Sequence, residues 1–149
     1  MRSAYSRRKA VDYAYLYCYD YNPNYPDWGA DYGGDCANFV SQAIFAGGKG
    51  MYGSDSTNTG TAWGENWFSY GKSTSTTKVS PSWRGTNAFK TYWQKNAEKY
   101  KKFTSYSKYA YHTLIIVSYE DGLICAQHTG SNDAMKLKNY NGDCIIYNM

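Results

Sequence analysis

A chain of 149 residues with 42% hydrophobic and 19% charged residues is long enough to bury one core and too apolar to be disordered, so we expect one domain over residues 1–149. The net charge of +4 favours an anionic partner, but the basic residues form no long block, which argues against nucleic-acid binding. No apolar run is long enough to span a membrane, and no signal peptide is recognisable.

The first half of the chain is predicted to be helical. Apolar residues recur at helical spacing over residues 6–20, where Ser6 is a suitable N-cap. They recur again over Cys36–Ala46, which is apolar on most sides and is therefore expected to be buried. Residues 49–81 are rich in Gly, Ser, Thr and Asn and predict a long irregular loop, and a third helix is expected over residues 86–101.

The second half of the chain is predicted to form strands. Residues 111–119 and 123–128 indicate a hairpin closed by the turn at residues 120–122. Residues 134–137 and 144–147 indicate a further pair of strands, joined by an Asn-Gly turn. Helices followed by strands predict an α+β fold, with N-terminal helices packed on a C-terminal antiparallel sheet.

Cys36 is the candidate nucleophile among the four cysteines. It follows Gly33-Gly34-Asp35 and opens the predicted buried helix, where the helix dipole favours a thiolate and free backbone N–H groups can stabilise an oxyanion. The other cysteines lie in apolar segments and are expected in the core. A Cys125–Cys144 disulfide stays open, since it requires neighbouring strands.

Two histidines, His112 and His128, are available as a base. They lie near the outer ends of the two strands of the predicted hairpin, so we expect them to be neighbours. One imidazole would take the Cys36 proton and the other would orient it. A zinc site formed by Cys36, His112 and His128 is the competing interpretation, although no local ligand pair supports it.

Aromatic residues are unusually frequent, with 18 Tyr, 5 Trp and 5 Phe. Trp63, Trp67 and Trp83 could form a groove wall that stacks on sugar or peptide, or they could anchor the long loop from inside. We assign Trp67 and Trp83, together with Asp35 beside the nucleophile, to substrate binding.

Several segments match one known family in order. They are residues 5–14, Asn22-Pro23-Asn24-Tyr25-Pro26, Gly34-Asp35-Cys36-Ala37-Asn38-Phe39-Val40-Ser41-Gln42, Trp67-Phe68, Ser82-Trp83, His112-Thr113-Leu114-Ile115-Ile116-Val117 and Gln127-His128-Thr129. With these segments the chain resembles the putative amidase domain family of Gram-positive bacteria and their phages, within the NlpC/P60 and papain-like group. The cysteine segment is the most specific match.

The resemblance implies a papain-like fold and a cysteine hydrolase of peptidoglycan amide bonds, either a muramoyl-alanine amidase or a peptide endopeptidase. It implies Cys36 as nucleophile, His112 as base and His128 as the orienting residue, or Asn132 or Asp133 if the strand register differs. No metal or cofactor is required. We expect a monomer, located at the cell wall or outside the cell, or in the cytosol until lysis if it comes from a phage.

Two other functions stay open. Family members usually carry a Gly-Asp turn and a strand ahead of the histidine, and residues 101–108 contain no Gly-Asp. A non-catalytic cell-wall-binding module on a decayed hydrolase fold would fit this departure and the aromatic excess. Acyl transfer to an acceptor other than water would use the same residues.

Overall fold

A computed structural model describes residues 4–29, 34–54, 64–103, 112–118, 124–128, 135–136 and 144–149. The helices are α1 (Arg7–Tyr17), α2 (Cys36–Ala46), α3 (Pro81–Arg84) and α4 (Thr86–Asn96). The strands are β1 (Ser69–Tyr70), β2 (Lys78–Val79), β3 (Lys99–Phe103), β4 (Ile115–Ser118), β5 (Ile124–Ala126), β6 (Met135–Lys136) and β7 (Cys144–Asn148). Helices and small antiparallel sheets together make the fold α+β.

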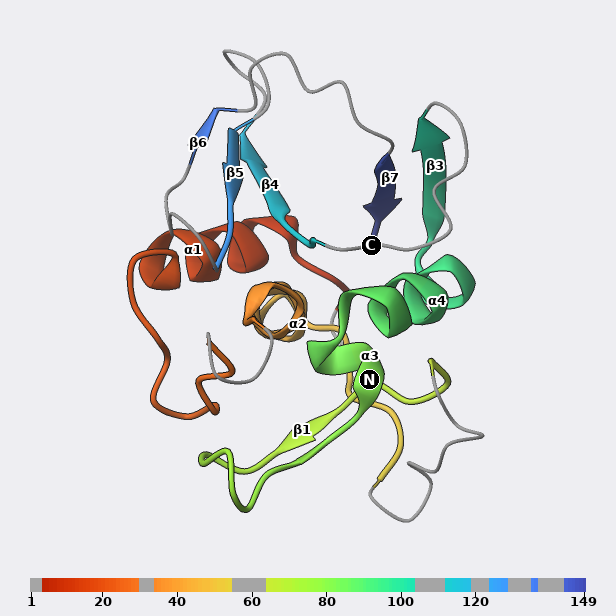
Figure 1. The fold of residues 1–149 in the computed structure, drawn as a ribbon. Coiled ribbons are helices and arrows are strands. Elements are labelled where there is room, and N and C mark those ends of the chain that lie inside the picture. The colour runs from red at the N-terminus through yellow and green to blue at the C-terminus, as the bar shows by residue number, and fades with distance from the viewer. Residues whose placement is uncertain are drawn as a thin grey trace.

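Helix α2 lies at the centre of the helical layer, with α1 on one side and α3 and α4 on the other (Figure 1). Nine of its 11 residues are buried, as its apolar sequence predicts. Helix α1 begins at the predicted cap, because the Ser6 side chain accepts a hydrogen bond from the Lys9 N–H at 3.2 Å. The Ser6 N–H in turn donates to the Gly47 carbonyl at 2.7 Å, which ties the start of α1 to the end of α2.

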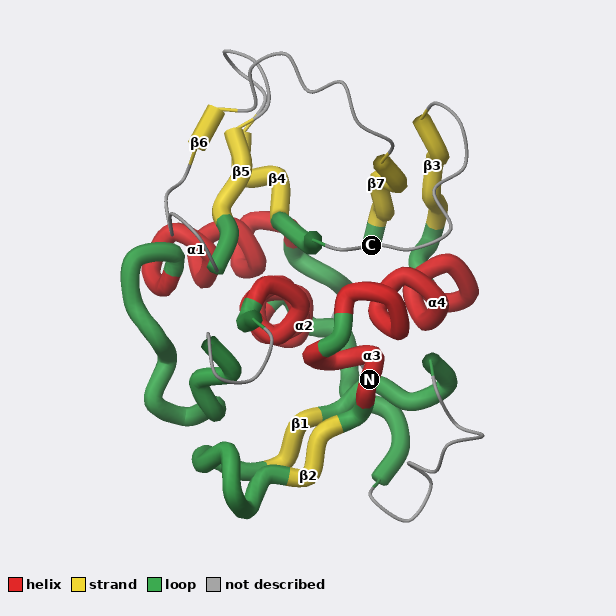
Figure 2. The backbone as a smooth tube through the Cα atoms, viewed as in Figure 1, coloured by secondary structure: helices red, strands yellow, loops and turns green. Residues whose placement is uncertain are grey.

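The strands lie on both sides of the helices. Sheets β4–β5–β6 and β3–β7 lie on one side, and the short β1–β2 pair lies on the other (Figure 2). The predicted hairpin pairing is confirmed, since β4 and β5 are antiparallel with Ile115 opposite Ala126. The turn predicted between them, at residues 120–122, lies outside the described residues.

Two predictions, one about the third helix and one about the last two strands, are wrong. The third helix ends at Asn96, because Ala97 adopts an extended backbone, and Lys99–Phe103 then pairs with β7 as a strand. The last two strands form no hairpin with each other. Instead β6 pairs with β5, and β7 pairs with the distant β3. The backbone N–H and C=O groups of these strands are paired with strands distant in the sequence, and local turn motifs do not predict such pairing.

The sequence predicts no segment that could span a membrane. In the part of the chain that the structure describes, no helix is long and apolar enough to cross a bilayer.

Candidate active site

Cys36 is the first residue of α2, and only 9% of its surface is exposed. Its sulfur lies 3.3 Å from the Thr86 hydroxyl oxygen and is hydrogen-bonded to His112 and to the backbone of Thr113. As the first helical residue, Cys36 has a backbone N–H with no acceptor inside the helix. Three distant segments of the chain therefore meet at one sulfur atom.

These contacts lower the pKa of the Cys36 thiol. Burial raises the pKa of Cys36, but the hydrogen bonds from His112, Thr86 and the Thr113 backbone, with the charge of His112, outweigh burial and lower the pKa to about 7. The pKa of His112 moves the opposite way. Its hydrogen bond with Cys36 raises that pKa, burial opposes the rise, and Gln127 adds to it. The two shifts together favour a thiolate–imidazolium pair.

Gln127 holds the second nitrogen of His112. The distance from His112 Nε2 to Gln127 Oε1 is 2.6 Å, which leaves Nδ1 for the thiol of Cys36. An amide oxygen only accepts, so this contact keeps a proton on Nε2 and fixes the ring orientation. Cys36, His112 and Gln127 thus form one hydrogen-bonded line, and Gln127 is a residue that the sequence analysis missed.

His128, the predicted orienting residue, does not occupy that place. Its Nδ1 lies 2.6 Å from Asp35 Oδ2, its Nε2 lies 2.6 Å from the Tyr17 carbonyl oxygen, and only 1% of the residue is exposed. The reason is strand alternation. When the alternation of side chains is continued beyond the Ile115–Ala126 pair, His112 and Gln127 fall on one face. His128 falls on the other face, where it contacts Tyr17 at the end of α1.

Asp35 is likewise turned inward. It is fully buried, and besides His128 its carboxylate accepts from the Trp28 N–H at 3.0 Å and the Asn38 side-chain amide at 2.8 Å. The predicted substrate contact of Asp35 is therefore corrected. Together with His128 it joins the start of α2 to the ends of α1 and β5, immediately beside Cys36.

The predicted substrate contacts of Trp67 and Trp83 are corrected for the same reason. Both are 0% exposed, and their rings pack 4.6 Å apart in the core. Ser41 of α2 accepts from Trp67 Nε1 at 3.0 Å and donates to the Trp83 carbonyl at 2.8 Å. Their aromatic surface stabilises the interior and is not available as a groove wall, whereas Trp63 lies outside the described residues.

The zinc interpretation requires His128 beside Cys36 and His112, and both ring nitrogens of His128 are engaged elsewhere. Within the described ranges, no three His, Cys, Asp or Glu side chains are grouped so that they could hold a metal ion. The alternatives Asn132 and Asp133 lie outside those ranges.

Cys125 is buried in β5 with a free thiol, and burial raises its pKa to about 11. Its strand pairs with β4 and β6, whereas Cys144 belongs to β7 in the other sheet, so the neighbouring strands that a disulfide needs are not formed.

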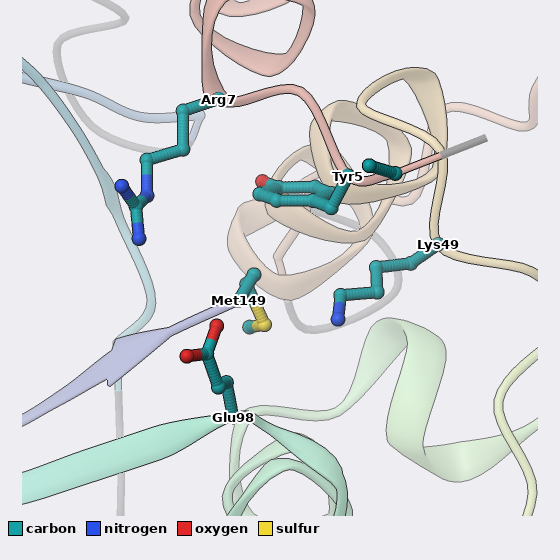
Figure 3. A pocket seen from close by; sticks show the side chains of 6 residues that line it. Tyr5, Arg7, Lys49, Glu98 and Met149 are labelled. Atoms are coloured by element: carbon teal, nitrogen blue, oxygen red, sulfur yellow. The ribbon is translucent and has the colours of Figure 1, made fainter.

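A separate surface hollow of about 460 Å³ shares no residue with this site. It is lined by Ala4, Tyr5, Arg7, Lys49, Glu98 and Met149 (Figure 3). Lys49 lies over the Tyr5 ring, 5.4 Å from its centroid, and Arg7 is hydrogen-bonded to Asn148. The hollow contains no cysteine or histidine and joins the segment before α1 to the end of β7.

The fold and the site define an α+β domain that aligns a cysteine, a histidine and a glutamine at a helix N-terminus. The chain belongs to the family described as "Putative amidase domain", whose sequence profile matches residues 4–148. Membership indicates amide hydrolysis as the general activity. Searches of curated proteins and of solved structures found no significant match.

Proposed function

We propose that this chain is a cysteine amidase in which Cys36 is the nucleophile, His112 the general base and Gln127 the residue that orients His112. The observation that carries the proposal is the line of contacts from the Cys36 sulfur through His112 to Gln127, at a thiol whose pKa lies near 7. A nucleophile, a base and an orienting group within hydrogen-bond reach are what covalent catalysis requires. The amidase family supplies the bond type.

The reaction would run through a thioester. The Cys36 thiolate attacks the amide carbon, and the carbonyl electron pair moves to oxygen, where the Cys36 N–H donates to it. Collapse of this intermediate breaks the C–N bond, and His112 gives its Nδ1 proton to the leaving amine. Water then loses a proton to His112 and attacks the thioester, which releases a carboxylic acid and regenerates the thiolate. Gln127 keeps the ring aimed through both half-reactions.

Peptidoglycan is the substrate class we favour. The motif resemblance points to amides of the bacterial cell wall, and the net charge of +4 suits an anionic wall polymer. A cysteine at the start of a buried helix, facing a histidine that leads into an antiparallel strand, also supports the papain-like and NlpC/P60-like fold. A monomer acting at the cell wall is part of the same proposal.

The test is digestion of purified Gram-positive cell walls, followed by mass spectrometry of the released fragments. Wild-type protein and Cys125→Ser should release fragments with new termini that identify the bond, whereas Cys36→Ser should release none. Cys125→Ser is the matched control, because it removes a second buried thiol that lies outside the site. If no variant releases fragments and all sediment with the walls, the chain is a binding module and the hydrolase proposal fails.

A further inference from the structure

The Thr86 side chain lies beside the Cys36 sulfur. It is the first residue of α4 and follows Gly85, whose extended backbone turns the chain out of α3. The residue is half-buried, and its Oγ1 lies 3.3 Å from the Cys36 sulfur. The first residue of α4 is therefore in contact with the first residue of α2.

Because Thr86 is the first residue of α4, this helix offers its hydroxyl no carbonyl four residues earlier. Thr91, inside the same helix, has such a partner and donates to the Asn87 carbonyl at 3.2 Å. In the described part of the chain, the hydrogen-bond partner found for the Thr86 hydroxyl is the Cys36 sulfur. The cap position of α4 is Gly85, so Thr86 is not needed as the N-cap.

Counting protons decides the direction of this hydrogen bond. Once His112 has taken the thiol proton, the sulfur has none to donate and can only accept. The Thr86 hydroxyl must then be the donor, and the positive end of α4 adds to the same effect. Among the described residues, the titratable group that faces the sulfur is His112, while the neighbouring Asp35 turns its carboxylate to His128.

We propose that Thr86 is a further catalytic residue, whose hydroxyl donates a hydrogen bond to the Cys36 thiolate and thereby stabilises the deprotonated, nucleophilic form of the cysteine. The role in hydrolysis rests on the proposed function. The effect on the thiol does not, since it can be measured with a reagent that needs no substrate site.

The experiment compares Thr86→Val, which keeps the shape and removes the hydroxyl, with Thr86→Ser, which keeps the hydroxyl. Each full-length protein is treated with iodoacetamide at a series of pH values, and labelling of Cys36 is followed by peptide mapping. In this reaction the thiolate attacks the CH₂ group, an S–C bond forms and iodide leaves. The midpoint of the pH profile is the readout, because the limiting rate also depends on the intrinsic nucleophilicity of the thiolate.

Thr86→Val should raise the midpoint by roughly one pH unit and slow labelling at pH 6 by up to about tenfold, as expected for a hydrogen bond to a charged group. Thr86→Ser should restore the wild-type midpoint. Thr91→Val, in the same helix, should leave it unchanged.

A wild-type midpoint in folded Thr86→Val overturns the proposal. If Thr86→Val does not fold, Thr86→Ala replaces it in the comparison. The proposal is then overturned if Thr86→Ser shifts the midpoint as far as folded Thr86→Ala does, because Thr86→Ser retains the hydroxyl. A shifted midpoint in Thr86→Val together with intact cell walls in the wild-type digestion would mean that Thr86 acts on the thiol and that the proposed substrate is wrong.

Discussion

The sharpest prediction separates the two residues that compete for the orienting role. His128→Ala removes a ring that is 1% exposed and deprives the buried Asp35 carboxylate of its contact with His128, while the Trp28 N–H and the Asn38 amide still donate to it. Removing a fully buried ring together with its hydrogen bonds costs about 3–5 kcal/mol. Gln127→Ala leaves the contact between Asp35 and His128 intact, and loss of its hydrogen bond to His112 should cost only about 1 kcal/mol of stability.

The effect on catalysis should be reversed. Without Gln127 the imidazolium of His112 loses a charge-assisted hydrogen bond of about 1.5–3 kcal/mol, so kcat/KM for fragment release should fall roughly ten- to hundredfold. His128→Ala, assayed well below its melting temperature, should keep more activity per folded molecule than Gln127→Ala.

Thermal melts and fragment-release assays on both variants measure the two effects. The melting temperature of His128→Ala should fall by about 10 °C or more. His128→Gln, whose amide can still donate to Asp35, serves if the alanine variant does not fold. A stable but inactive His128 variant beside a fully active Gln127→Ala would refute the geometric reasoning and restore His128 as the orienting residue.

Three further predictions follow from the same contacts. Since the pKa of Cys36 is lowered to about 7 and that of Cys125 is raised to about 11, alkylation monitored by peptide mapping should label Cys36 at neutral pH and leave Cys125 unlabelled; equal rates would contradict this. Because the folded-state pKa of Cys36 lies below its ordinary value of 9.0, its thiolate contributes stability that is present above pH 9 and is lost as the pH falls through about 7. Urea titrations across that window should therefore show the free energies of unfolding of wild type and Cys36→Ser converging at low pH. Trp67→Ala should lower the free energy of unfolding by about 3–5 kcal/mol, because the ring is fully buried, and an unchanged melting temperature would restore the groove interpretation.

The helix that carries the nucleophile could be predicted from sequence because its signal is local. An apolar run bounded by glycines defines Cys36–Ala46, and the same glycine-to-helix junction marks Cys36. The hairpin of β4 and β5 was also accessible, through its two apolar runs. In both cases residues close in sequence determine the structure.

The residues that the prediction missed depend on register and on long-range packing. Which of Gln127 and His128 faces His112 is decided by a single-residue step just beyond the end of β5, and a turn signal does not resolve such a step. The 50-residue separation between Thr86 and Cys36 is bridged only by the packing of α3 and α4 on α2. Trp67 and Trp83 were wrongly assigned to substrate binding, because the sequence around an aromatic residue in a polar loop does not show whether its side chain is buried.

The meeting of three distant segments at one sulfur has a consequence for synthesis of the chain. A growing polypeptide that has emerged only through α2 already contains Cys36, but it lacks Thr86 and His112, the groups that lower the pKa of that thiol. Its cysteine would react as slowly as any ordinary thiol. The Cys36 thiol thus becomes reactive only after the C-terminal strands have docked, and its reactivity indicates that folding is complete.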